Sequence, residues 1–169
     1  DPAKWGNDPT LNPKVREALG LAIDKQAILK TGYGFLIPNE SIYNYRSYGW
    51  RKERAEQPAP YDPDRAKKLL AEAGYPNGFE TTAHFAEFAG RPNQKEAMDI
   101  IASNWKAIGV TVQVVEHDPF KYYADQDAGK RAYLPINEWT WGRQENGIFI
   151  AQIAYASTGF RSLYNEKTD

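Results

Sequence analysis

Residues 79–115 read FETTAHFAEFAGRPNQKEAMDIIASNWKAIGVTVQVV, and this stretch predicts a strand, a helix and a second strand. Residues 79–85 and 110–115 are short runs rich in β-branched and aromatic side chains, which is typical of strands. Between them, a helical stripe of apolar residues precedes Gly109, which ends the helix; the stripe comprises Ala97, Ile100, Ile101, Trp105 and Ile108. This order predicts two parallel strands joined by a right-handed crossover.

The residues that follow extend the same pattern. Asp118 and Pro119 form a helix-start signal for a helix that carries Phe120, Tyr123 and Ala124. Residues 132–139 predict a third strand. The sequence therefore predicts an α/β fold with a mainly parallel central sheet flanked by helices.

The residues before the first strand predict three helices. Two of them begin with a capping residue followed by proline, at 12–13 and 62–63, and a shorter one runs from Asp24 through Lys30. Their apolar residues recur at helical spacing: Val15, Ala18, Leu19 and Ala22 in the first, and Ala66, Leu69, Leu70 and Ala73 in the last.

Residues 33–61 form a long segment with little periodicity, which we expect to be irregular. It contains several aromatic residues, namely Tyr43, Tyr45, Tyr48 and Trp50. Such side chains suit a ligand cleft, and they equally suit a loop that is packed down by its own aromatics. Both interpretations stay open for this segment.

Composition limits the class of protein. The chain has 169 residues, with 21 Lys and Arg against 22 Asp and Glu, and it has no Cys. This length suits one domain over residues 1–169, and the lack of Cys excludes disulfide scaffolds, thiolate zinc sites and cysteine nucleophiles. The near-zero charge, without a basic block, argues against a nucleic-acid partner. Without an apolar run of about 18 residues or a signal peptide at its start, the chain is expected to be soluble, and mature or trimmed.

Three segments should meet at the carboxyl ends of the strands: 86–93, 116–118 and 140–147. In the first, Arg91 precedes Asn93, a predicted helix N-cap, and the two could hold a carboxylate or phosphate; an exposed surface arginine is the alternative. The third follows Trp139 and includes Trp141, whose indole faces suit sugar rings, peptide planes or cations, although a core position is an alternative.

Other chemistry finds little support in the pattern. His84 and His117 lie 33 residues apart with no spacing to a third ligand, so no metal site is expected. The sequence contains neither a nucleophile elbow around a serine nor a glycine-rich phosphate loop. Glu138 and Glu145 could act as a glycosidase pair or hold an ammonium group, so a sugar-active hydrolase is the rival function.

Four stretches also carry a family resemblance: residues 12–28, 61–79, 108–112 and 162–169. They resemble the extracellular solute-binding proteins of ABC transporters of the dipeptide, oligopeptide and nickel type, family 5. The resemblance implies a periplasmic-binding-protein-like (type II) lobe. It also implies that residues 1–169 form the carboxy-terminal lobe of a longer, two-lobed protein.

The function implied by the resemblance is capture of a small solute between two lobes for delivery to the permease of an ABC importer. Such a protein is not an enzyme and needs no cofactor. Its partners are a small-molecule ligand and permease subunits, with no nucleic acid. It is periplasmic or extracytoplasmic, and it meets the membrane only through the permease or a lipid anchor outside residues 1–169.

The resemblance also implies the ligand contacts. Arg91 matches the family arginine that pairs with the ligand carboxylate, and the remaining candidates are Asn93, Trp139, Trp141, Arg143 and Glu145. The aspartate that holds a peptide's amino group after the tryptophan is missing from this sequence, although Glu145 could substitute for it. The implied ligand is therefore a peptide, a sugar, an opine-like conjugate or another metabolite.

Overall fold

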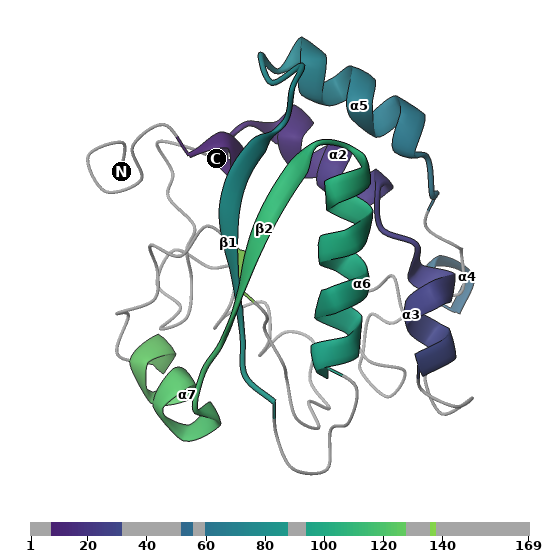
Figure 1. Ribbon diagram of the computed structural model, residues 1–169. Helices are drawn as coiled ribbons and strands as arrows, with labels where there is room; N and C mark the ends of the chain where they lie inside the picture. Colours follow the sequence, from purple (N-terminus) through teal and green to yellow (C-terminus); the bar gives the residue numbers. More distant parts are fainter. Residues whose placement is uncertain (1–7, 32–51, 56–59, 88–93, 128–135, 138–169) are drawn as a thin grey trace.

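The computed structural model describes residues 8–31, 52–55, 60–87, 94–127 and 136–137, which form a parallel sheet with helices around it (Figure 1). The elements, in chain order, are η1 (Pro9–Leu11), α2 (Pro13–Leu21), α3 (Lys25–Thr31), α4 (Lys52–Ala55), α5 (Pro63–Glu72), β1 (Phe79–Phe85), α6 (Gln94–Ala107), β2 (Val110–Glu116), α7 (Pro119–Asp127) and β3 (Ile136–Asn137).

The strands lie in the order β2-β1-β3, and both pairings are parallel. Phe79 lies opposite Val110 and Phe85 opposite Glu116, so β1 and β2 begin and end at the same level. The prediction of an α/β fold with a parallel sheet is confirmed for the described strands, and so are the first two strand positions.

The predicted third strand and the predicted irregular segment are described only in part. Within 132–139, the structure describes the two residues of β3, which pair with Ala83 and His84 of β1. Within 33–61 it describes the single helical turn of α4 and residues 60–61. The expected irregular segment thus contains one turn of helix.

Two glycines set the level at which β1 and β2 begin. Gly78 has φ 75° and Gly109 has φ 93°, values that only glycine adopts readily. A Cβ added to Gly78 would lie 1.8 Å from the carbonyl oxygen of Gly109, so the two backbones approach too closely for any side chain. This contact holds the amino ends of the two strands together.

The predicted helix caps before the sheet are confirmed. The Asn12 side chain accepts a hydrogen bond from the backbone N–H of Lys14 at 2.9 Å, and the Asp62 side chain accepts one from Arg65 at 2.9 Å. Each satisfies a backbone donor that the first turn leaves free. Gly74, with φ 93°, follows the end of α5 as the sequence predicted.

Ion pairs also join α2 to α5. Lys14 Nζ lies 2.7 Å from Glu72 Oε2, and Arg65 Nη2 lies 2.8 Å from Glu17 Oε1. The hydrogen bond and the charge of Lys14 lower the pKa of Glu72. All four side chains are about half exposed, so these pairs contribute little to stability and the apolar contacts between the helices dominate.

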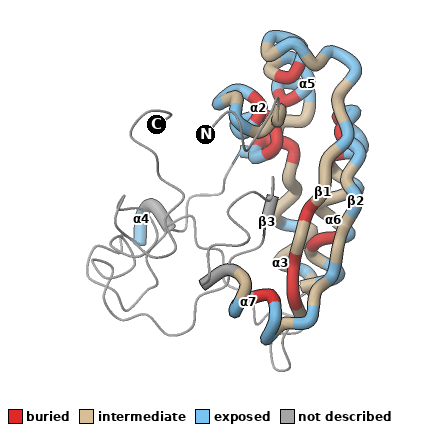
Figure 2. The backbone as a smooth tube through the Cα atoms, turned by 90° about the vertical axis from the view of Figure 1, so that its left-hand side faces the viewer, coloured by how far each residue is buried: buried red, intermediate tan, exposed pale blue. Residues whose placement is uncertain are grey.

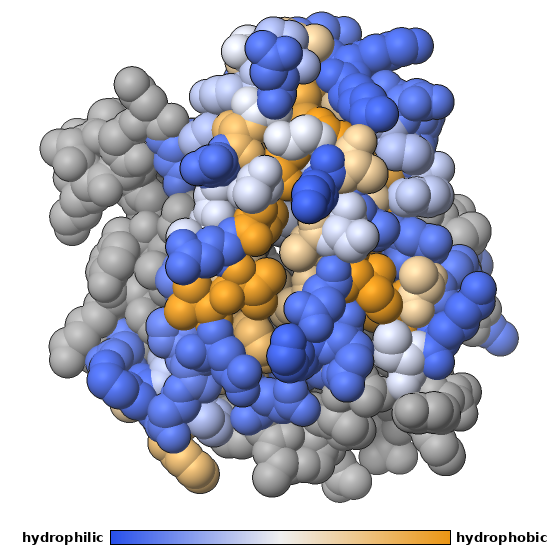
Figure 3. All heavy atoms as spheres, viewed as in Figure 1, coloured by the Kyte–Doolittle hydropathy of each residue, from blue (hydrophilic) through white to orange (hydrophobic). Residues whose placement is uncertain are grey.

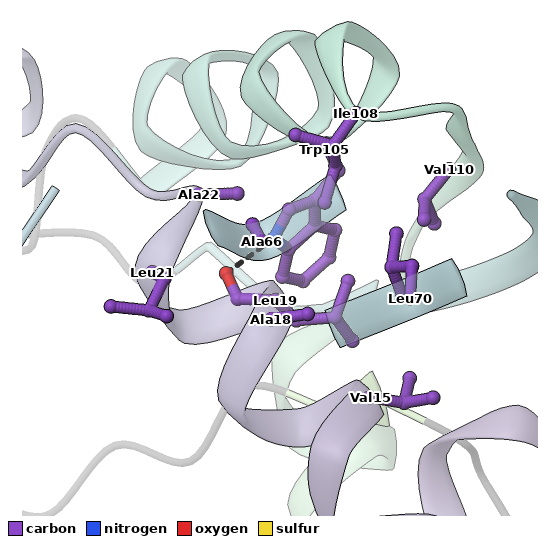
Figure 4. Packing of buried hydrophobic residues seen from close by; sticks show 10 residues of the cluster. All are labelled: Val15, Ala18, Leu19, Leu21, Ala22, Ala66, Leu70, Trp105, Ile108 and Val110. Atoms are coloured by element: carbon purple, nitrogen blue, oxygen red, sulfur yellow. Dashed lines mark hydrogen bonds between the residues drawn. The ribbon is translucent and has the colours of Figure 1, made fainter. Parts of the chain in front are cut away.

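The main core lies where α2, α5 and the end of α6 meet. Figure 4 shows the Trp105 indole among apolar side chains from these helices, with its Nε1–H donating to the backbone carbonyl of Leu19 at 2.9 Å. The buried members of this cluster are Val15, Ala18, Leu19, Leu21, Ala22, Ala66, Leu70, Trp105, Ile108 and Val110. The sequence predicted most of these residues as the inner faces of their helices.

A second, smaller cluster lies between the carboxyl half of β1 and α6. It contains Ala83, Phe85 and Met98, and the buried part of β1 is visible in Figure 2. Met98 therefore belongs to the inner face of α6, whereas the predicted Ala97 and Ile100 are only half-buried. A stripe that begins at 98 repeats at 101, 105 and 108, and this fits the helical period.

The predicted helix after β2 is confirmed as α7, and the residue that it buries is Tyr122. Phe120 is 77% exposed and Ala124 is also exposed, whereas Tyr122 is 1% exposed. Asp118 caps this helix by accepting from the backbone N–H of Lys121 at 2.9 Å. The helix lies at the end of the sheet and buries Tyr122. The Tyr122 hydroxyl bonds to β1, and its ring contacts His117, just after β2.

The surface in Figure 3 is mainly hydrophilic, with apolar side chains in separate patches. Within the part of the chain that the structure describes, no helix has both the length and the apolar character needed to cross a bilayer.

Replacing Leu70 with Ala should lower the free energy of unfolding by about 2 to 5 kcal/mol, because its 1% exposed side chain fills the main core. Leu11→Ala is the matched control, since Leu11 is 47% exposed and should change stability little. Chemical denaturation monitored by tryptophan fluorescence measures both. Equal stability of Leu70→Ala and the parent would contradict this packing.

Candidate functional site

The carboxyl ends of β1 and β2 form the candidate site. The segment after β1 leads to α6 and the segment after β2 leads to α7, and Figure 1 shows these helices on opposite sides of the strand pair. The contacts agree, because Phe85 packs with Met98 of α6, whereas the neighbouring His84 points to the other face. Ligands of open α/β sheets bind at such a point, where neighbouring connections diverge.

Two histidines meet at this edge. His84 Nδ1 lies 2.8 Å from His117 Nε2, and the ring centroids are 5.1 Å apart. The other nitrogen of His84, Nε2, lies 3.1 Å from the Thr82 hydroxyl oxygen. Both imidazoles are partly exposed. The edge therefore carries a hydrogen-bonded imidazole pair that solvent can reach.

Tyr122 connects this pair to α7. Its hydroxyl donates to the backbone carbonyl of His84 at 2.9 Å, and its ring centroid lies 5.1 Å from that of His117. The backbone N–H of His117 donates to the carbonyl of Phe85 at 3.0 Å, which extends the strand pairing beyond β2. Two successive carbonyls at the end of β1 are thus held by His117 and Tyr122. We call His84, His117 and Tyr122 the ring stack.

A cation lies on the α6 side of the same edge. Lys95, in the first turn of α6, donates to Asp99 at 3.1 Å. That hydrogen bond and the charge of Asp99 raise the pKa of Lys95, with smaller contributions from Glu116 and Glu96. Lys95 therefore remains protonated at neutral pH and adds positive charge near the entrance to α6.

The described residues hold no group of three or more His, Cys, Asp or Glu side chains suited to a metal ion. The imidazole pair alone supplies two nitrogen ligands, whereas protein zinc sites use three or four protein ligands. The described contacts of the pair are hydrogen bonds and ring contacts.

The sequence-predicted ligand contacts lie outside the described residues. These are Arg91, Asn93, Trp139, Trp141, Arg143 and Glu145, together with Glu138 of the rival hydrolase interpretation. Of the three segments expected to converge, the structure describes 116–118 and residues 86–87. These two parts do lie together, because His117 bonds to the last residue of β1.

The ring stack is a feature that sequence reasoning missed. The spacing of His84 and His117 along the chain argues only against a metal site and says nothing of a contact between the two rings. The sequence does contain a signal for this contact. Phe85 lies as many residues after Gly78 as Glu116 lies after Gly109, and these two residues pair across the strands. Aligning the two strands in this way brings the histidines to the same edge.

Comparison with known proteins identifies the family. The family model described as "Bacterial extracellular solute-binding proteins, family 5 Middle" matches residues 3–157. The chain belongs to this family. The fold is accordingly that of a type II periplasmic binding protein, as the sequence predicted.

Relatives within the family are similar over much of this chain. Heme-binding protein A of Haemophilus influenzae is 40% identical over 118 residues, covering 65% of this chain and 20% of the relative. The glutathione-binding protein GsiB of Pectobacterium atrosepticum is 34% identical over 159 residues, covering 89% of this chain and 26% of the relative. This chain therefore spans about a fifth to a quarter of the length of these relatives.

A solved structure agrees with the fold. HbpA2 from Haemophilus parasuis superimposes with a TM-score of 0.72 at 27% sequence identity, over 96% of this chain and 32% of HbpA2. The family is extracellular by its description, and the proteins named above are binding proteins or their structural relatives. None of them supports the rival interpretation of a sugar-active hydrolase built on Glu138 and Glu145.

Tyr122→Phe should lower stability by about 0.5 to 1.5 kcal/mol, because it removes one hydrogen bond, to His84 O, and keeps the buried ring. Tyr61→Phe is the matched control, because it removes the same hydroxyl from a side chain that is 51% exposed, and it should change stability little. Thermal unfolding compares the two. If Tyr61→Phe proves the more damaging change, the Tyr122 hydroxyl does not hold α7 to the end of β1.

Proposed function

We propose that this chain belongs to the substrate-binding component of an ABC importer, which captures a small solute and delivers it to a membrane permease. The observation that carries the proposal is the family match over residues 3–157. The described fold supports it, because the diverging connections after β1 and β2 create the kind of strand edge at which ligands bind.

Residues 1–169 would supply one lobe of a two-lobed protein, and the ligand would lie between the lobes. The short share of its relatives that this chain spans supports that division. In this role the protein binds and releases its solute without catalysis. It works outside the cytoplasm, in the periplasm or anchored at the cell surface, and its partners are the solute and the permease subunits.

The solute class that we favour carries a carboxylate. Heme and glutathione, the ligands in the names of the two relatives, both contain carboxylate groups. Arg91 would pair with that group, and Asn93 would add a polar contact at the start of α6.

The segment after the third strand would complete the site. Trp139 and Trp141 would cover the apolar part of the ligand, and Arg143 and Glu145 would contact its polar groups. Glu145 would take an ammonium group where the ligand has one. This set suits a peptide-like or conjugate ligand that carries both charges.

Arg91→Ala in the complete protein should weaken binding of a carboxylate ligand by about 10- to 150-fold, because a charge-assisted hydrogen bond is lost. The probes are reduced glutathione and hemin, with maltose as an uncharged comparison, and isothermal titration calorimetry measures each affinity. Arg65→Ala is the matched control, because Arg65 pairs with Glu17 on the distant surface of α5 and should leave binding unchanged.

Trp141→Ala distinguishes the ligand classes in the same assay. A sugar should lose most of its affinity in this variant and respond little to Arg91→Ala, because stacking on an indole would be its main contact. If a bound probe is held equally well by the parent and by both variants, the proposed ligand contacts are wrong.

A further inference from the structure

We infer that the ring stack is a proton-sensitive latch, in which His117 and Tyr122 position the carboxyl end of β1 through a proton shared between His84 and His117. The ring stack lies at the edge where the connections to α6 and α7 diverge. Any effect of the latch on ligand binding rests on the proposed function. The latch itself can be tested without a ligand.

The latch holds both the backbone and a side chain at the end of β1. Tyr122 Oη–H donates to the carbonyl of His84 at 2.9 Å, and the His117 N–H donates to the carbonyl of Phe85 at 3.0 Å. The His84 side chain is held in turn by His117 on one side and Thr82 on the other. The same neighbours therefore fix this end of the strand immediately before residues 86–93.

The number of protons on the two rings decides whether the contact can form. The facing nitrogens, His84 Nδ1 and His117 Nε2, lie 2.8 Å apart, so one of them must donate and the other must accept. Two neutral rings carry two ring protons and can form this bond, and a third proton can be placed on an outward-facing nitrogen. A fourth proton would place a hydrogen on both facing nitrogens and give both rings a positive charge. The contact therefore survives one positive charge and is lost with two.

This proton count gives the direction of the change with pH. When the contact is open, each imidazole is able to take a second proton, so in acid the open edge binds one more proton than the latched edge. The opening equilibrium therefore rises as pH falls, by up to about tenfold per pH unit. Imidazoles of model peptides take their second proton at about pH 6.5, which sets the pH range to examine. The latch is therefore closed at neutral and alkaline pH and weakened in acid.

Other charged groups lie near the latch on the described elements around it. On β2 and the turn after it, Glu116 and Asp118 flank His117 in the chain, and Asp118 caps α7. On α7, Lys121 pairs with Asp125, and on α6, Lys95 pairs with Asp99. On β1, the titratable neighbour of Thr82 and His84 on the same face is Glu80. The described residues of β3, which pair with Ala83 and His84, have no titratable side chain.

Hydrogen exchange of the His117 amide tests the latch, because this amide donates across the edge to Phe85. In the complete protein, its protection factor, corrected for the intrinsic exchange rate, should fall by up to about tenfold per pH unit between pH 6 and pH 5. Amides of β2 that face β1 with the same parity as His117, such as those of Thr111 and Gln113, are the internal controls and should show no such step. A flat protection factor for His117 from pH 7.5 to 5 overturns the inference.

His117→Gln is the decisive variant. Its carboxamide can either donate to or accept from His84, so the contact should persist in both protonation states of that ring and the acid step should vanish. Tyr122→Phe keeps both imidazoles and should retain the step. An acid step in His117→Gln equal to that of the parent would show that the pair is not the source.

A second variant is needed if His117→Gln disturbs the strand, which would show as lost protection of the amides in the middle of β2 against hydrogen exchange. His84→Asn places a carboxamide where Nδ1 lies and should also abolish the step. Persistence of the step in His84→Asn overturns the latch. Because none of these measurements uses a ligand, their failure leaves the proposed function standing, and failure of the binding tests leaves the latch standing.

Discussion

The contact between Gly78 and Gly109 determines the level at which the two long strands begin. A Cβ on Gly78 would lie 1.8 Å from the Gly109 carbonyl oxygen, so position 78 must be glycine, and the φ of 93° at Gly109 also favours glycine. In the parallel register that begins at this point, Phe85 lies opposite Glu116, and the His84 side chain contacts His117. The arrangement of the candidate site is thus set at the opposite end of the strands, by residues that have no side chain.

Trp105 holds the helices to this sheet. Its indole fills the main core, and its Nε1–H bonds to Leu19 O, which ties α6 to α2 (Figure 4). Capping residues and helical spacing predicted these elements because both signals are local in the sequence. The burial of Tyr122 and the exposure of Phe120 were not predicted, because they depend on how that short helix meets the sheet.

The candidate site was predictable in its location and only partly in its residues. Strand order alone indicated that the segments after β1 and β2 would meet, and Phe85 and His117 do meet there. The imidazole pair was not recognised, because a pairing between distant residues becomes apparent only when the two strands are placed in register. Strand order indicated Arg91 and Trp141 as ligand contacts and the family resemblance gave Arg91 a carboxylate to bind, and these remain predictions.

We propose that solute binds at the carboxyl ends of β1 and β2. A crystal structure of the complete protein with reduced glutathione or hemin bound would show where the solute lies. We expect ligand atoms to contact residues that follow these strands, with the carboxylate at Arg91. A ligand bound at the amino ends of the strands, near Gly78 and Gly109, or on the outer surface of α2 and α5, would contradict it.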